Sequence, residues 1–319
     1  MKRRLSVSAG CVLVALLVAA APAPPLRAMR WLATAADPVK ELTTRPAECL
    51  ASPADPAARA AVEIGRAAFA SPLLLGGQAA RAGLSCDSCH RAGRGNPAFR
   101  FPGISGAAGT ADVTASLFST RRGDGIDNPV LIPDLAGPPE QLKRARDPAL
   151  LRSFIRGLIV EEFDGAEPPP AVLAGLTAYV RALSPAACPA TRHEAVRVSD
   201  AVADADRAVM AAQQALAGGD RATAAAMLLA ARGQLGLIDE RFAGSALAAG
   251  RAALRAQDDD LRAILTAVRA ADAGASDGIV RWHRGVPALA ARLNRHAARS
   301  LFDPGTLAAA LRRDAERQP

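Results

Sequence analysis

The chain has 319 residues, which is enough for two domains of ordinary size. Its formal net charge is +8, and nearly all of the positive charge is arginine, because lysine occurs only at Lys2, Lys40 and Lys143. The basic residues alternate with Asp and Glu instead of clustering, which argues against a nucleic-acid-binding site and favours a solvated surface that attracts an acidic partner.

Residues 1–28 are predicted to be a signal peptide. Positions 2–4 are positively charged, positions 12–20 form a short apolar run, and a small-x-small cleavage site begins at Ala21. An uncleaved anchor is the alternative, although the run is short for a membrane span. No later segment is long and apolar enough to cross a bilayer, so we expect no membrane span after cleavage and a periplasmic protein.

Residues 29–55 show no long apolar period and are interpreted as a linker with one short helix that starts at Asp37-Pro38. The same start signal recurs at Asp55-Pro56. A helix over residues 57–70 should follow, with Gly65 and Phe69 one turn apart on one face.

The most informative stretch is Cys86-Asp87-Ser88-Cys89-His90, the spacing typical of c-type haem attachment. Two thiols on one helical turn can reach the two vinyl groups on one porphyrin edge, and the next residue can ligate the iron. A redox Cys-x-x-Cys or half of a zinc site is the alternative. Zinc would need a second ligand pair nearby, and a redox motif would need an α/β context. We therefore predict one covalent haem c, with Cys86 and Cys89 as thioether anchors and His90 as the proximal, metal-ligating residue.

The export signal and the haem motif support each other, because covalent haem attachment follows translocation. An oxidising compartment also permits a disulfide between Cys49 and Cys188, the alternative being two free thiols.

Residues 93–139 are rich in Gly, Pro, Asn and Asp, and should form a long loop that covers the faces of the haem. A helix from Asp147-Pro148 to about Val160 is then predicted, followed by a turn over 161–165 and a last helix over 171–183. The first of these two helices should turn Leu150, Leu151, Phe154, Ile155 and Leu158 inward. The second should bury Val172, Leu176, Tyr179, Val180 and Leu183.

This order of a first helix with Gly-x-x-x-Phe, the haem motif and a last helix with Tyr179 resembles a class I cytochrome c domain. More narrowly, residues 65–74 and 84–90, together with Asn128-Pro129 and the residues up to Leu135, resemble the bacterial cytochrome c peroxidase family, which includes MauG-like proteins. The resemblance covers about residues 57–184. It implies that the first and last helices cross, with the glycine allowing the aromatic residue of the last helix to approach.

Two features depart from that family. The family carries two haem motifs and this chain has one. Residues 91–184 also contain no Met or His to serve as the usual sixth ligand. Either the iron is five-coordinate and open to peroxide, or a residue from the C-terminal region closes the site. His193 is the nearest candidate, with a surface or capping role as the alternative.

Peroxide cleavage needs an acid or base nearby, and the family resemblance implies a distal Glu. Glu161 and Glu162 are the candidate catalytic residues in this chain, and a solvated pair at a helix end is the alternative.

Residues 190–319 are rich in Ala, Leu and Arg, with helices expected at about 192–217, 220–242, 244–273, 279–300 and 304–316. The predicted fold class is all-α, with a cytochrome c-like haem domain at 56–189 followed by a C-terminal helical bundle of unknown role at 190–319.

The sequence thus predicts a periplasmic c-type haem protein that transfers electrons, and the resemblance adds peroxide reduction as an oxidoreductase activity. Its expected partners are a small redox protein as electron donor and hydrogen peroxide, with no nucleic acid. The alternative is a haem-based sensor, or an assembly or docking subunit of a respiratory system, without enzymatic activity.

Overall fold

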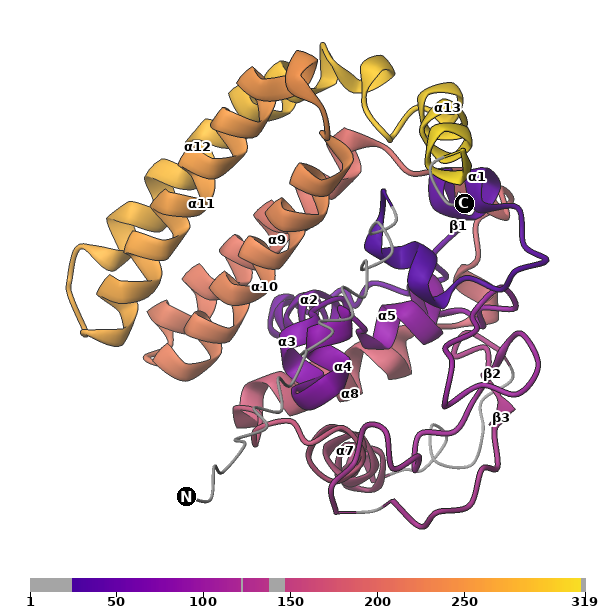
Figure 1. Ribbon diagram of the computed structural model, residues 1–319. Helices are drawn as coiled ribbons and strands as arrows, with labels where there is room; N and C mark the ends of the chain where they lie inside the picture. Colours follow the sequence, from indigo (N-terminus) through magenta and orange to yellow (C-terminus); the bar gives the residue numbers. More distant parts are fainter. Residues whose placement is uncertain (1–24, 122, 138–146, 317–319) are drawn as a thin grey trace, which may run out of the picture.

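The computed structural model describes residues 25–121, 123–137 and 147–316, and helices dominate it (Figure 1), as expected for the all-α class. The helices are α1 (Pro38–Thr43), α2 (Pro56–Phe69), α3 (Pro72–Leu75), α4 (Gly77–Ala82), α5 (Cys86–Cys89), α7 (Pro148–Gly157), α8 (Pro170–Ala182), α9 (Val198–Ala217), α10 (Arg221–Arg241), α11 (Ala248–Arg269), α12 (Ala275–Asn294) and α13 (Pro304–Ala315). Short helical segments are η1 (Arg27–Trp31), η2 (Arg91–Gly93), η3 (Leu158–Glu162), η4 (Pro185–Ala187), η5 (Ser245–Leu247) and η6 (Ala297–Arg299). The signal-peptide prediction falls mainly on residues that lie outside the described ranges.

Four short strands in the described residues form two antiparallel pairs: β1 (Thr44–Pro46) with β4 (His193–Ala195), and β2 (Thr110–Ala111) with β3 (Val130–Leu131). The first pair joins chain segments about 150 residues apart, and it lies next to a disulfide between Cys49 and Cys188. The disulfide prediction is therefore confirmed, and the alternative of two free thiols is wrong.

The segment expected to be a linker contains η1, α1 and β1, and it packs against the rest of the chain. Helix α1 starts where the sequence predicted, because Asp37 Oδ1 accepts hydrogen bonds from the backbone of Val39 at 2.9 Å and Lys40 at 3.2 Å. Leu26 and Leu42 are buried in a small apolar cluster with Leu301 and Leu307, which ties the N-terminal segment to α13.

Helices α2 and α8 cross at two glycines. A Cβ added to Gly65 would lie 2.0 Å from the carbonyl oxygen of Gly175, so neither side of the crossing has room for a side chain. The predicted crossing is present, but the expected reason for it is wrong: Gly65 faces the backbone of α8 and not its aromatic residue. Tyr179 packs instead on Phe69, with ring centroids 5.1 Å apart. All five residues predicted to be inward on α8 are buried.

Two residues of α7 that were predicted to face inward, Leu150 and Phe154, are exposed, so that prediction is wrong for them. Leu151 is buried, whereas Leu150 is 58% and Phe154 is 51% exposed. Helix α7 packs against α8, and Leu150 and Phe154, four residues apart, share a face of α7 that remains exposed. The chain then continues as the π-helical turn η3, so the helical region extends into the segment 161–165 that was expected to be a turn.

Helices α9, α10, α11 and α12 lie side by side in the C-terminal part, with α9 and α10 packed against α2 (Figure 1). Five helices are present in the described part of this region, as predicted, but some bounds differ: α9 and α11 start six and four residues later than expected, and α12 starts four residues earlier and ends six residues earlier. One continuous apolar core runs from α2 and α8 through these four helices. The two parts of the chain therefore share a core.

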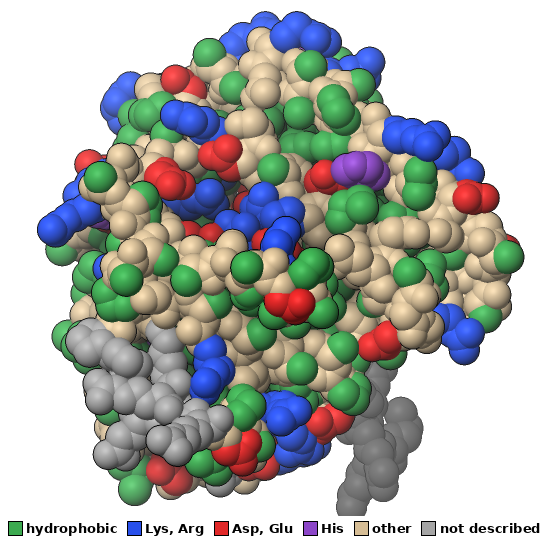
Figure 2. Space-filling view, turned by 180° about the vertical axis from the view of Figure 1, so that it is seen from behind, with side chains coloured by type: hydrophobic (Ala, Val, Ile, Leu, Met, Phe, Trp, Pro, Cys, Tyr) green, Lys and Arg blue, Asp and Glu red, His purple; other side chains and the backbone are tan. Residues whose placement is uncertain are grey.

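Figure 2 shows Lys and Arg side chains spread among acidic ones over one face of the molecule. Among the described helices, none combines the length and the hydrophobicity that a transmembrane span requires.

Candidate functional site

The haem-motif residues form a single helical turn. Ser85 is extended, and its backbone N–H donates to Ser88 Oγ at 3.0 Å, which fixes the start of α5. Cys86 and Cys89 are therefore one turn apart, and both are free, half-buried thiols. Burial raises the pKa of each thiol to about 12. A redox-active Cys-x-x-Cys depends on a lowered thiol pKa, so these cysteines do not have that character.

His90 follows directly, and its backbone N–H donates to the Cys86 carbonyl at 2.8 Å. Its ring Nδ1 lies 3.0 Å from the carbonyl oxygen of Pro133. Because a carbonyl only accepts, Nδ1 carries the proton and the lone pair of the ring is on Nε2. Burial lowers the pKa of His90 to about 4, so the imidazole is neutral near pH 7. A neutral imidazole with Nδ1–H bound to a carbonyl is the state in which histidine ligates a metal through Nε2.

Residues that follow the motif in the chain help to fix it. Asn96 Nδ2 donates to the Ser88 carbonyl at 2.8 Å, and Asp87 Oδ1 accepts from the backbone of Ala92 at 2.8 Å. Ala92 has a φ of 52°, an uncommon value for a residue with a side chain, and the hydrogen bond to Asp87 stabilises the turn that this value creates.

Helix α2 places an aromatic ring near the imidazole. The Phe69 ring lies 6.4 Å from the His90 ring, centroid to centroid, and packs on Tyr179. The Tyr179 hydroxyl donates to Glu48 Oε1 at 2.8 Å, and Glu48 also pairs with Arg66. The α2–α8 crossing therefore places an aromatic side chain beside the candidate ligand.

The described residues around the two thiols and His90 show no zinc-type ligand set. No described group of three His, Cys, Asp or Glu side chains is arranged to hold a metal ion, so Cys86, Cys89 and His90 do not converge on one point. Six of the seven exposed large apolar residues that the structure describes follow the motif in the chain, at positions between 117 and 154. They are Leu117, Ile126, Val130, Leu131, Leu150 and Phe154. A porphyrin offers an apolar surface that such residues could cover.

The two candidate catalytic residues lie in the π-helical turn η3, in different environments. The Glu161 side chain is 39% exposed and lies 3.9 Å from Arg156. Glu162 is buried, with 5% of the residue exposed. Single π-helical turns often occur at functional sites, so the position of both glutamates in such a turn is compatible with a functional role.

None of the histidines of the C-terminal region contacts His90. His193 lies exposed in β4, opposite Pro46 in β1. His283 Nδ1 is 2.7 Å from Asp206, and His296 lies beside Arg299. Each of these described histidines has its own local surroundings, so the structure gives no support to His193 as a sixth ligand.

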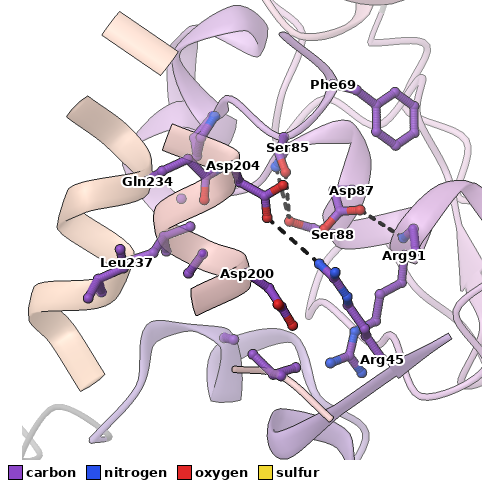
Figure 3. Close-up of a pocket in the computed structure, with 18 of the residues that line it drawn as sticks. Arg45, Phe69, Ser85, Asp87, Ser88, Arg91, Asp200, Asp204, Gln234 and Leu237 are labelled. Carbon is purple, nitrogen blue, oxygen red and sulfur yellow. Dashed lines mark hydrogen bonds and ion pairs between the residues drawn. The ribbon is translucent and has the colours of Figure 1, made fainter. Parts of the chain in front are cut away.

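A cavity of about 300 Å³ lies on the other face of α5, between the haem motif and helices α9 and α10 (Figure 3). Asp87 and Ser88 face it, whereas Cys86, Cys89 and His90 are not among its lining residues. Several of its charged groups are paired with one another, for example Arg45 with Asp204 at 3.7 Å. The cavity is thus separate from the thiols and the imidazole.

The sequence predicted Cys86, Cys89 and His90 as site residues but not the contact of His90 with Pro133, although Pro133 lies in the segment that carried the family resemblance. Its role belongs to a backbone carbonyl, which any residue type supplies, so no side-chain pattern could have identified it. Comparison of the chain with protein-family models, with curated proteins and with solved structures found no match.

Proposed function

We propose that this protein is an exported c-type haem protein that transfers electrons. Cys86 and Cys89 would bind the porphyrin through thioethers, and His90 would ligate the iron through Nε2. The observation that carries the proposal is the 3.0 Å contact between His90 Nδ1 and the Pro133 carbonyl, beside two free thiols on one helical turn. Bound haem would supply a one-electron couple and an iron that can bind a small ligand.

The proposal includes a cytochrome c-like haem domain over 56–189 and a helical bundle over 190–319. Export agrees with the Cys49–Cys188 disulfide, because disulfides persist in oxidising compartments. Leu26 is buried, so signal cleavage ahead of residue 25 would preserve its packing with Leu42 and Leu307.

Peroxide reduction of the cytochrome c peroxidase type is the second proposed activity, with a small redox protein as donor. It rests on the absence of Met and His from residues 91–184 and on the buried carboxyl of Glu162. Of the two candidates, Glu162 suits an acid–base role better, because its carboxyl is buried in the π-helical turn η3, whereas Glu161 is partly exposed. The Glu161 side chain lies 3.9 Å from Arg156 at a partly exposed position.

Absorption spectra of the purified protein test the open site. A high-spin ferric spectrum, with carbon monoxide binding after reduction, is expected. A low-spin spectrum in both oxidation states would remove the peroxidase activity and leave a simple electron carrier.

Steady-state peroxide reduction with a reduced small cytochrome then separates an enzyme from a haem-based sensor or docking subunit. Glu162→Gln should lower the rate by about a hundredfold, the usual range for losing a general acid or base. Glu161→Gln is the matched control and should retain most of the activity. Equal rates for the two variants would refute the role of Glu162.

A further inference from the structure

Arg94 links the disulfide to the loop that holds His90. Its Nε lies 2.9 Å from Asp134 Oδ1 and 2.8 Å from Oδ2, and its Nη2 lies 2.8 Å from Oδ2. Because the guanidinium is a rigid planar fork, these contacts fix the direction of the carboxylate as well as its distance.

The other side of the same guanidinium lies against the disulfide. Arg94 Nη1 is 3.1 Å from Cys49 Sγ and 3.8 Å from Cys188 Sγ. Cys49 is fully buried, so it offers a fixed contact, whereas Cys188 is exposed and within reach of a thiol reductant. Arg94 is therefore held from two sides.

Asp134 links the fixed guanidinium of Arg94 to His90, the candidate iron ligand. It directly follows Pro133, whose carbonyl accepts from His90 Nδ1. Asp134 Oδ1 also accepts from the backbone of Ala136 at 2.9 Å, which closes the local turn. Disulfide, Arg94, Asp134, Pro133 and His90 thus form one unbroken series of contacts.

We propose that Arg94 is a positioning residue for His90, and that the Cys49–Cys188 disulfide keeps Arg94 in the place where it acts. The inference rests on the proposed haem-binding function. Donation from Nδ1–H to a well-placed carbonyl makes the imidazole a stronger donor, which favours ferric over ferrous iron. Loosening the Pro133 segment should therefore raise the midpoint potential of the haem.

Charge must be kept constant in the test, because a lost arginine alone would favour the ferric state and hide the effect. Arg94→Lys retains the charge and removes the fork. The double variant Arg94→Gln/Asp134→Asn removes both charges at once. Each variant should raise the ferrous-to-ferric ratio at a fixed potential by about tenfold, which is the lower end of the effects seen when an outer-shell partner of a metal ligand is lost. For a one-electron couple, a tenfold change corresponds to a shift of about 59 mV in the midpoint potential.

A second bidentate pair in the chain supplies matched controls. Arg232 Nε lies 2.7 Å from Asp258 Oδ1, and its Nη2 lies 2.9 Å from Oδ2, between helices α10 and α11. Arg232→Lys and Arg232→Gln/Asp258→Asn should leave the potential unchanged. Equal potentials for the Arg94 and Arg232 variants, all with covalent haem, would overturn the positioning role.

The disulfide is tested in the same measurement. Cys49→Ser/Cys188→Ser should raise the potential in the wild-type background and have no further effect in Arg94→Lys. If this variant does not fold, the disulfide of the wild-type protein can instead be reduced with a phosphine. The phosphine is oxidised as the disulfide takes up two electrons and two protons. After the reagent is removed, the potential of the reduced protein gives the same comparison. An equal shift in both backgrounds would refute the link through Arg94. Wild type without covalent haem would overturn the proposed function itself.

Discussion

At the scale of single residues, the environment of His90 couples the protonation of the ring to folding. Burial lowers its pKa from 6.5 to about 4 in the folded haem-free chain. Between these two values the unfolded chain binds the extra proton and the folded chain does not. The neutral ring therefore favours folding above pH 6.5, and stability is lost as the pH falls from 6.5 to 4.

We expect the haem-free protein to lose about 1–3 kcal/mol from this residue across that pH range. The check is urea unfolding at pH 7 and pH 4.5 for wild type and His90→Gln. The variant should show a smaller pH dependence than wild type, whereas His193→Gln, at an exposed position, should retain it. The same pH dependence in His90→Gln would contradict the assignment.

At this scale the sequence predicted the thiols and the imidazole, because their chemistry belongs to side chains at a fixed spacing. It could not predict Pro133 or the contact between Arg94 and the disulfide. Both depend on segments that meet only after the chain has folded.

At the scale of elements, the crossing of α2 and α8 packs Tyr179 on Phe69, whose ring lies beside His90. Gly65 and Gly175 bring the two backbones into contact, so the crossing tolerates no Cβ at Gly65 without a shift of one helix. A shift there would move Phe69, whose ring lies 6.4 Å from the His90 ring, and the Tyr179 ring that packs on it.

Gly65→Ala should destabilise the protein by about 3 kcal/mol, since its Cβ would meet backbone that cannot rotate away. The matched control is Gly233→Ala in α10, where an added Cβ meets no atom within 4 Å. That variant should gain up to about 1 kcal/mol from helix propensity. Chemical unfolding of both variants makes the comparison, and a neutral or stabilising Gly65→Ala would show that the helices do not cross as described.

Helix periodicity predicted most of the elements but did not fix which face of a short helix is buried. Helix α7 has apolar residues on two faces, and the sequence alone gives no reason to choose the face of Leu151 over that of Leu150 and Phe154. Only the position of α8 decides this.

At the scale of the whole molecule, the N-terminal segment is joined to the end of the haem-motif part. The β1–β4 pair and the Cys49–Cys188 disulfide lie at this junction, and the disulfide spans 139 residues of sequence. Local sequence patterns indicated a linker there, because long-range strand pairing leaves little trace in three-residue strands.

A disulfide that closes so long a loop should stabilise the fold by up to about 5 kcal/mol through restriction of the unfolded chain. Urea unfolding with and without a thiol reductant should show a lower midpoint in the reduced protein. An unchanged midpoint would mean that the contacts around β1 hold the junction without the bond.

The most direct test of the central claim is covalent haem attachment. The chain is expressed for export in cells that attach haem c, denatured, and examined for haem that stays with the polypeptide. One haem per chain is expected in wild type, with none retained in Cys86→Ala/Cys89→Ala. A well-folded wild-type protein without retained haem, or a double variant that keeps it, would contradict the account.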